Sequence, residues 1–162
     1  MQITPVKVTD LPQIMTIERA GFSDAEAGSQ AAYQERIQKL GSTFLVARDG
    51  DVVLGFIVGP ATTERYIEDE MFATPPTNLA HGGHQLVFTL AVAPVARHQH
   101  VGSQLLAALE ADARAKGRTS LSLTCLKRLV PFYEQNGFTN QGVAASSHAD
   151  ETWYNLEKVW DK

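Results

Sequence analysis

The chain has 162 residues, of which 44% are hydrophobic and 20% charged, so it can bury one core and we expect a single domain over residues 1–162. Its formal net charge of −4 argues against a nucleic-acid or anionic-membrane surface as partner, because such surfaces need clustered Lys and Arg. The first residues carry neither a basic start nor an apolar run, and Cys125 has no second cysteine to pair with. We therefore expect a cytoplasmic protein.

The first third of the chain predicts two helices and a hairpin. A strand is expected over 2–8, followed by a helix from Leu11 that ends at Gly21. A second helix opens at Ser29 and ends at Gly41. Two apolar, β-branched runs around a glycine-containing turn then predict a β-hairpin over 43–58.

The rest of the chain alternates strands and helices after a long loop. Periodicity fades over 59–83, where we expect a functional loop that contains a short helix. The almost wholly apolar run 86–92 predicts one central strand covered on both faces. The remaining predicted elements are a helix from Val101 to Gly117, strands over 119–124, 138–143 and 152–158, and a helix over 130–137.

The succession of a buried strand, a basic glycine-containing turn and a helix start is the feature with the clearest chemical meaning. The turn runs from Arg97 to Ser103. Because the first N–H groups of a helix lack intrahelical acceptors and carry partial positive charge, such a turn can hold a diphosphate. The order of these elements predicts an α/β protein with a phosphate-bearing cofactor.

Motifs that occur in order over most of the chain resemble the GNAT superfamily of acyl-CoA-dependent N-acetyltransferases, and within it the arylalkylamine (serotonin) N-acetyltransferase branch. The motifs lie at residues 17–22, 55–59, 64–65, 82–84, 90–92, 97–103 and 129–134. The resemblance implies a mixed sheet of about seven strands with about four helices, in which two central strands splay apart.

The resemblance also implies two stretches that bind acetyl-CoA. Main-chain groups of Leu90, Ala91 and Val92 would hold the pantetheine arm and the thioester carbonyl. The residues expected around the diphosphate are Arg97, His98, Gln99, His100, Val101, Gly102 and Ser103. His100 stands where the family pattern has its first glycine, and we expect it to adopt the left-handed conformation that histidine tolerates better than most residues.

Acyl transfer to an amine needs an acid for the departing thiolate and a base for the amine. The resemblance places Tyr133 beside the sulfur, where its phenol can donate a proton. The positions at which arylalkylamine enzymes carry two histidines are close to Leu86 and Phe88, and both are apolar. His84 is the first candidate for the base. The alternatives are His81, Glu18, Glu68, Asp69, Glu70 and a chain of ordered water.

The implied function is acetyl-CoA-dependent transfer of an acetyl group to a small arylalkylamine- or polyamine-like primary amine by direct attack. Acetylation of a protein N-terminus or lysine, and non-catalytic acyl-CoA binding, stay open as alternatives. A covalent acyl-enzyme at Cys125 is less favoured, because no partner histidine is placed near it in the sequence. The five histidines and one cysteine show no metal-ligand spacing, so no metal is expected, and both a monomer and a homodimer suit this fold.

Overall fold

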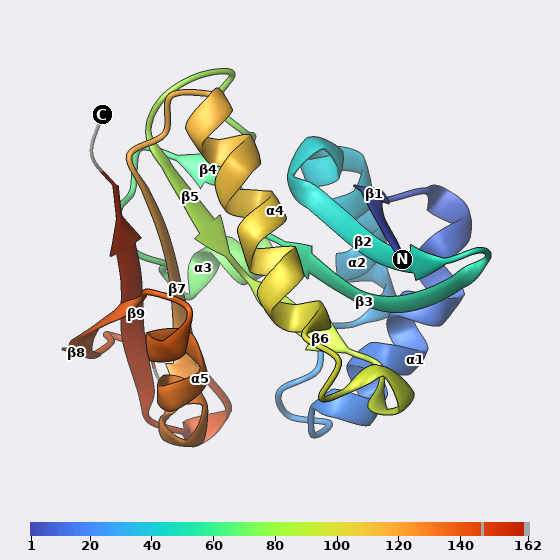
Figure 1. The fold of residues 1–162 in the computed structure, drawn as a ribbon. Helices are drawn as coiled ribbons and strands as arrows, with labels where there is room; N and C mark the ends of the chain where they lie inside the picture. Colours follow the sequence, from blue (N-terminus) through green and yellow to red (C-terminus); the bar gives the residue numbers. More distant parts are fainter. Residues whose placement is uncertain (147, 161–162) are drawn as a thin grey trace. The chain divides into compact units, whose positions relative to one another are not determined.

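The computed structural model describes residues 1–146 and 148–160, and Figure 1 shows its elements in chain order. The chain forms two compact units. Unit 1 comprises Met1–Gly59 and Thr89–Leu109, and unit 2 comprises Pro60–Phe88 and Glu110–Lys162. Helix α4 (Val101–Ala115) begins in unit 1 and ends in unit 2. Within the described residues, no helix combines the length and the apolar character needed to span a bilayer.

Unit 1 is built on a four-stranded antiparallel sheet with the order β1-β2-β3-β6. Its strands are β1 (Gln2–Pro5), β2 (Phe44–Asp49), β3 (Val52–Val58) and β6 (Thr89–Val92). The predicted hairpin is confirmed as β2 and β3. Gly50 lies in its turn with φ 60°, a conformation that glycine adopts without steric cost.

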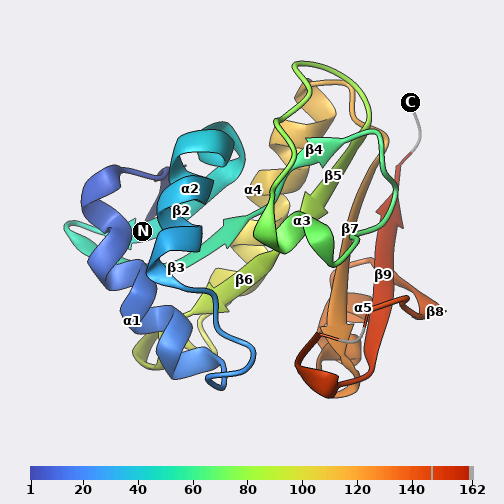
Figure 2. The same cartoon turned by 180° about the vertical axis from the view of Figure 1, so that it is seen from behind.

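Helices α1 (Leu11–Gly21) and α2 (Gln30–Leu40) cover one face of this sheet, as Figure 2 shows. Helix α2 begins where it was predicted, because the side-chain oxygen of Ser29 accepts a hydrogen bond of 3.1 Å from the N–H of Ala32. Tyr33 of α2 packs edge-on against Phe44 and Phe56, with ring centroids 6.3 and 5.6 Å away. These three fully buried rings form the centre of the core of unit 1.

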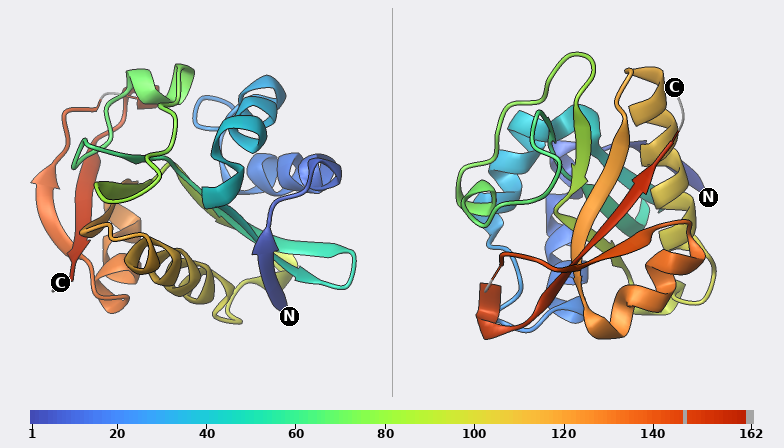
Figure 3. Two further views of the ribbon diagram at one scale, coloured as in Figure 1. Left: turned by 90° about the horizontal axis from the view of Figure 1, so that it is seen from above. Right: turned by 90° about the vertical axis from the view of Figure 1, so that its left-hand side faces the viewer.

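Unit 2 is built on a five-stranded sheet with the order β4-β5-β7-β9-β8. Its strands are β4 (Ala61–Thr62), β5 (His84–Val87), β7 (Ser120–Leu126), β9 (Trp153–Val159) and β8 (Thr139–Val143). Strands β5 and β7 run parallel, and the other neighbouring pairs are antiparallel. Helix α5 (Val130–Gln135) packs against β8 and β9, and Figure 3 shows it beside them.

The α/β class is confirmed, but the expected continuous strand over 86–92 is wrong. It is divided at Phe88 into β5 and β6, which belong to different sheets. The apolar run does not reveal this break, because both halves are half-buried or buried and only their pairing partners differ. The described chain has nine strands and five α-helices instead of about seven and four. The additional strands include β4, which is too short to leave a periodic pattern, whereas the short helix expected within 59–83 is confirmed as α3 (Glu70–Ala73).

Candidate active site

Strand β6 is at the edge of the unit 1 sheet, and its outer side carries free backbone groups. The N–H of Ala93 donates to the carbonyl of Leu54 at 2.8 Å, and the same register pairs Ala91 with Phe56. In an antiparallel ladder hydrogen-bonded and non-hydrogen-bonded pairs alternate. The N–H and C=O groups of Leu90 and Val92 therefore point away from β3. Of the three predicted residues, Ala91 instead uses its backbone groups within the sheet.

Gly55 allows β3 to approach this strand closely. A Cβ atom at Gly55 would lie 2.8 Å from the carbonyl oxygen of Ala91 and 3.3 Å from both the Cα of Val92 and the Cγ1 of Val101. Only glycine fits between the two strands and the first turn of α4. Gly55 thus fixes β6 and the start of α4 relative to one another within unit 1.

The turn before α4 contains two residues in the left-handed conformation. His98 and His100 have φ values of 65° and 62°, so the left-handed conformation predicted for His100 is confirmed. The N–H of Gln104 donates to the carbonyl of His100 at 3.0 Å, which leaves the N–H groups of the preceding turn without acceptors in α4. Successive left-handed and right-handed residues with free N–H groups form a concave anion-binding nest.

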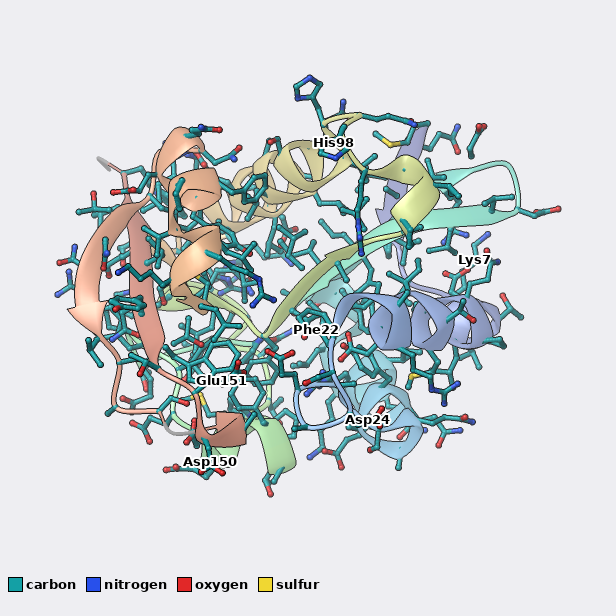
Figure 4. The ribbon with its side chains drawn as sticks, turned by 90° about the horizontal axis from the view of Figure 1, so that it is seen from below. Lys7, Phe22, Asp24, His98, Asp150 and Glu151 are labelled. Atoms are coloured by element: carbon teal, nitrogen blue, oxygen red, sulfur yellow. The ribbon has the colours of Figure 1, made fainter. Side chains whose placement is uncertain are left out.

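The side chains of residues 97–100 are exposed, and Arg97 adds a positive charge. Figure 4 shows His98 directed away from the ribbon. The side chain of Arg97 comes close to Gly21 at the end of α1, where an added Cβ would be 3.9 Å from its Nη2 atom. Gln99 stabilises the turn, because its Nε2 donates a hydrogen bond of 3.3 Å to the carbonyl of Val95.

Tyr133 is buried in unit 2, in helix α5. Its ring packs edge-on against Phe132 and Phe138, with centroids 5.0 and 5.7 Å away. Burial, with a smaller contribution from the thiol of Cys125 nearby, raises the pKa of Tyr133 well above its usual value. Burial also raises the pKa of Cys125 to about 12, so this thiol stays protonated and makes a poor nucleophile at neutral pH.

His84 lies at the other end of the β5–β7 pair. Its Nδ1 is 2.6 Å from the Oγ of Ser120, the first residue of β7, and 3.3 Å from the Oγ1 of Thr119. Cys125, whose thiol contributes to the pKa of Tyr133, is near the opposite end of β7, about 17 Å further along an extended strand. The structure therefore does not bring His84 and Tyr133 together.

Comparison with known proteins identifies the family. The family model described as "Acetyltransferase (GNAT) domain" matches residues 40–140, which include β6, the turn before α4 and Tyr133. The chain belongs to the GNAT acetyltransferase family. No curated protein sequence matches the chain significantly.

Solved structures of GNAT proteins share the fold over nearly the whole chain. The GphF GNAT-like decarboxylase in complex with isobutyryl-CoA has a TM-score of 0.82 at 15% identity, covering 98% of this chain and 99% of its own. An aminoglycoside 6'-N-acetyltransferase complexed with coenzyme A has a TM-score of 0.73 at 17% identity, covering 98% and 97%. The ribosomal-protein-S18-alanine N-acetyltransferase from Escherichia coli has a TM-score of 0.72 at 16% identity, covering 99% and 94%.

The long loop of this GNAT chain is anchored in unit 2 by charged and polar contacts. The guanidinium of Arg65 forms two hydrogen bonds with the buried carboxylate of Glu157 on β9. The Oγ of Ser122 on β7 donates to the carbonyl of Arg65 at 2.6 Å. The carboxyl groups of this loop are exposed, and a hydrogen bond with Glu70, the charge of Glu70 and the charge of Glu64 raise the pKa of Glu68.

One group of side chains in unit 1 was not predicted as a unit. Glu18 is one of the predicted candidate bases, whereas the sequence predicts no functional role for Tyr33 or Thr89. The structure places the Tyr33 hydroxyl 3.4 Å from the Oγ1 of Thr89 and beside the carboxylate of Glu18. No sequence signal connects these residues, because they come from α1, α2 and β6.

Proposed function

We propose that this GNAT protein transfers the acetyl group of acetyl-CoA to a small primary amine, of the arylalkylamine or polyamine kind, by direct attack of the amine. The observation that carries the proposal is the open edge of β6, where the N–H and C=O groups of Leu90 and Val92 point away from β3. An extended amide-containing arm such as pantetheine can pair with such an edge. Acetyl-CoA would supply the activated thioester.

The residues of unit 1 fit the two polar parts of this co-substrate. A main-chain N–H at the edge of β6 would donate to the thioester carbonyl and stabilise the negative charge that grows there during attack. The free N–H groups at the start of α4, with the left-handed turn at His98 and His100, would hold the diphosphate. Arg97 adds a fixed positive charge to the same turn.

Tyr133 is the proposed acid for the departing thiolate. Its raised pKa keeps the phenol protonated at neutral pH, so it has a proton to donate. We expect Tyr133→Phe to lower turnover by about 10- to 1000-fold and to leave coenzyme A affinity unchanged. Turnover and a pH–rate profile equal to those of the wild type would exclude this role.

A cationic acceptor suits the acidic loop of unit 2. Glu64, Glu68 and Glu70 concentrate negative charge on the segment that Arg65 anchors, and such a field raises the local concentration of an ammonium ion. Release of free thiol from acetyl-CoA should therefore be faster with diamines and arylalkylamines than with neutral hydroxyl compounds. Preference for peptides over these amines would favour acetylation of protein substrates instead.

The binding step has its own test. Titration of the folded protein with coenzyme A or acetyl-CoA in a calorimeter should give heat with one binding site. Absence of heat at millimolar concentration would refute the whole proposal. Binding without thiol release from any amine or peptide would indicate an acyl-CoA-binding module.

A further inference from the structure

Glu18 of helix α1 is a buried carboxylate with an incomplete set of partners. Glu18 is 2% exposed to solvent. Its Oε2 accepts a hydrogen bond of 2.7 Å from the N–H of Gly28, whereas its Oε1 is buried and has no well-formed hydrogen bond among the described residues. A carboxylate removed from water is costly unless it is fully paired. This arrangement favours uptake of a proton.

Helix α2 supplies the titratable and charged groups that face this carboxylate. They are the hydroxyl of Tyr33 and the guanidinium of Arg36, which lies 4.7 Å from the centre of the Tyr33 ring. Burial raises the pKa of Glu18 above its usual value, against the opposing effects of the Gly28 and Tyr33 hydrogen bonds and the Arg36 charge. Glu18 is therefore a stronger base than a carboxylate in water.

A chain of hydroxyl groups connects Glu18 with strand β6. The hydroxyl of Tyr33 interacts with the Glu18 carboxylate and lies 3.4 Å from the Oγ1 of Thr89. Thr89 is half-buried and immediately precedes Leu90, whose backbone groups face the open edge of the sheet. Each hydroxyl can both donate and accept, so a proton can pass along the chain in either direction.

We propose that the Thr89 hydroxyl, the Tyr33 hydroxyl and the Glu18 carboxylate form a proton relay that takes up the proton lost by the attacking amine. The relay deepens the proposed function and rests on it. A proton of the substrate ammonium passes to the Oγ1 of Thr89, the hydroxyl proton of Thr89 passes to Tyr33, and that of Tyr33 passes to Glu18. The products are a neutral amine and a protonated Glu18, with both hydroxyls restored.

The relay supplies the base that β5 and the residue after it do not provide. An alkylammonium ion has a pKa of about 10.4, so only about one amine molecule in a thousand is neutral near pH 7.4. Leu86 lies within β5 and Phe88 at the break between β5 and β6, and neither can accept a proton. Glu18 replaces a base on that strand, and Thr89 is the one member of the relay that touches the amine.

The test compares three variants and one control variant, with acetyl-CoA and an alkylamine as substrates. Glu18→Gln keeps an oxygen for the Gly28 N–H but removes the base, and Thr89→Val removes the first hydroxyl without changing the side-chain shape. We expect each to lower kcat/KM by about 100-fold near neutral pH, and to replace the acid limb of the wild-type pH–rate profile by a rise that continues toward the amine pKa of about 10.4. Thr89→Ser should recover most of the rate lost in Thr89→Val. Glu35→Gln on α2 is the matched control and should behave as the wild type.

An aromatic amine separates proton removal from a structural role, because it is already neutral at the assay pH. Glu18→Gln and Thr89→Val should lose less than about 3-fold with it, whereas a misplaced strand would lower both rates alike. Coenzyme A affinity and the melting temperature of Thr89→Val should equal those of the wild type.

Failure of the relay and failure of the proposed function give different results. If the wild type releases no thiol with any amine, the proposed function is wrong. If the wild type is active while Thr89→Val and Glu18→Gln retain its rate and pH profile, the relay is wrong. Equal losses with both amines would also overturn it, since they would assign Glu18 a structural role.

Discussion

The close approach of β3 and β6 predicts that a single methyl group at Gly55 will damage the proposed thioester site. In Gly55→Ala the new Cβ would lie 2.8 Å from the carbonyl oxygen of Ala91, about 0.6 Å inside ordinary contact distance. That oxygen cannot move away freely, because Ala91 is hydrogen-bonded to Phe56 in the ladder. The side chain of Val101 and the Cα of Val92 restrict movement in the other directions at 3.3 Å.

The expected cost follows from these contacts. Forcing a methyl group into a packed site costs about 1–3 kcal/mol. The unfolded chain of the Ala variant has less conformational entropy, which stabilises its folded state by about 0.4–1 kcal/mol. The two ranges combine to a net loss of about 0–2.6 kcal/mol in the free energy of unfolding, with a midpoint of about 1.3 kcal/mol. We also expect weaker coenzyme A binding, since β6 must shift outward to relieve the contact.

Gly41→Ala is the matched control. Gly41 has an ordinary right-handed conformation with φ −56°, and an added Cβ would meet no atom within 4 Å. It should leave stability unchanged or raise it by about 0.4–1 kcal/mol. Urea denaturation measures both variants, and calorimetry measures their affinity for coenzyme A. A Gly55→Ala protein as stable and as tightly binding as Gly41→Ala would show that β3 and β6 are not packed this closely.

Two further predictions concern unit 1. Asp10→Asn should lower the free energy of unfolding, measured by urea denaturation, by about 3 kcal/mol. The buried guanidinium of Arg48 would lose the carboxylate that it now contacts at 2.7 and 3.0 Å. The control Asp49→Asn, at an exposed position, should change stability by less than about 0.5 kcal/mol. Burial raises the pKa of Asp10, but hydrogen bonds from Arg48 and the Lys7 backbone outweigh this effect and lower the pKa overall. The extra stability of the wild type over Asp10→Asn should therefore be complete above the usual Asp pKa of about 3.9. It should disappear as the pH falls through the lower pKa of the folded state. An advantage that persists at the lowest pH would contradict this assignment. His100→Gly should keep the affinity for coenzyme A measured by calorimetry. His100→Val should weaken it, because a β-branched residue tolerates a φ of 62° poorly. Equal affinities of the two variants would show that the turn does not need this conformation.

The sequence predicted those elements whose signal is local. The caps at Ser29 and Gly41 and the glycine turn at Gly50 depend on neighbouring residues, so the helix α2 and the hairpin were found with nearly correct bounds. The division of the apolar run at Phe88 depends on which distant strands pair with each half, and composition carries no trace of that choice. The left-handed conformation of His100 was predicted because the family pattern has glycine at that position.

The candidate site likewise has features that the local sequence predicts and features that depend on packing between distant segments. The backbone groups of Leu90 and Val92 and the turn before α4 were predicted from a continuous motif. The position of His84 against Ser120 and the contacts of Glu18 with α2 result from packing between separate elements. Proton acceptors are therefore harder to find from the sequence than cofactor-binding backbone, because several elements can deliver a carboxylate or an imidazole to one place.

Strand β6 explains how one short segment can serve both halves of the proposed reaction. Main-chain groups of a strand lie in the plane of its sheet, whereas its side chains stand perpendicular to that plane. Leu90 and Val92 can thus hold the acyl group at the sheet edge while the side chain of Thr89 reaches Tyr33 on the face covered by α1 and α2. Acyl binding and proton removal would then use different directions of the same backbone, so substitutions at Thr89 should change one without changing the other.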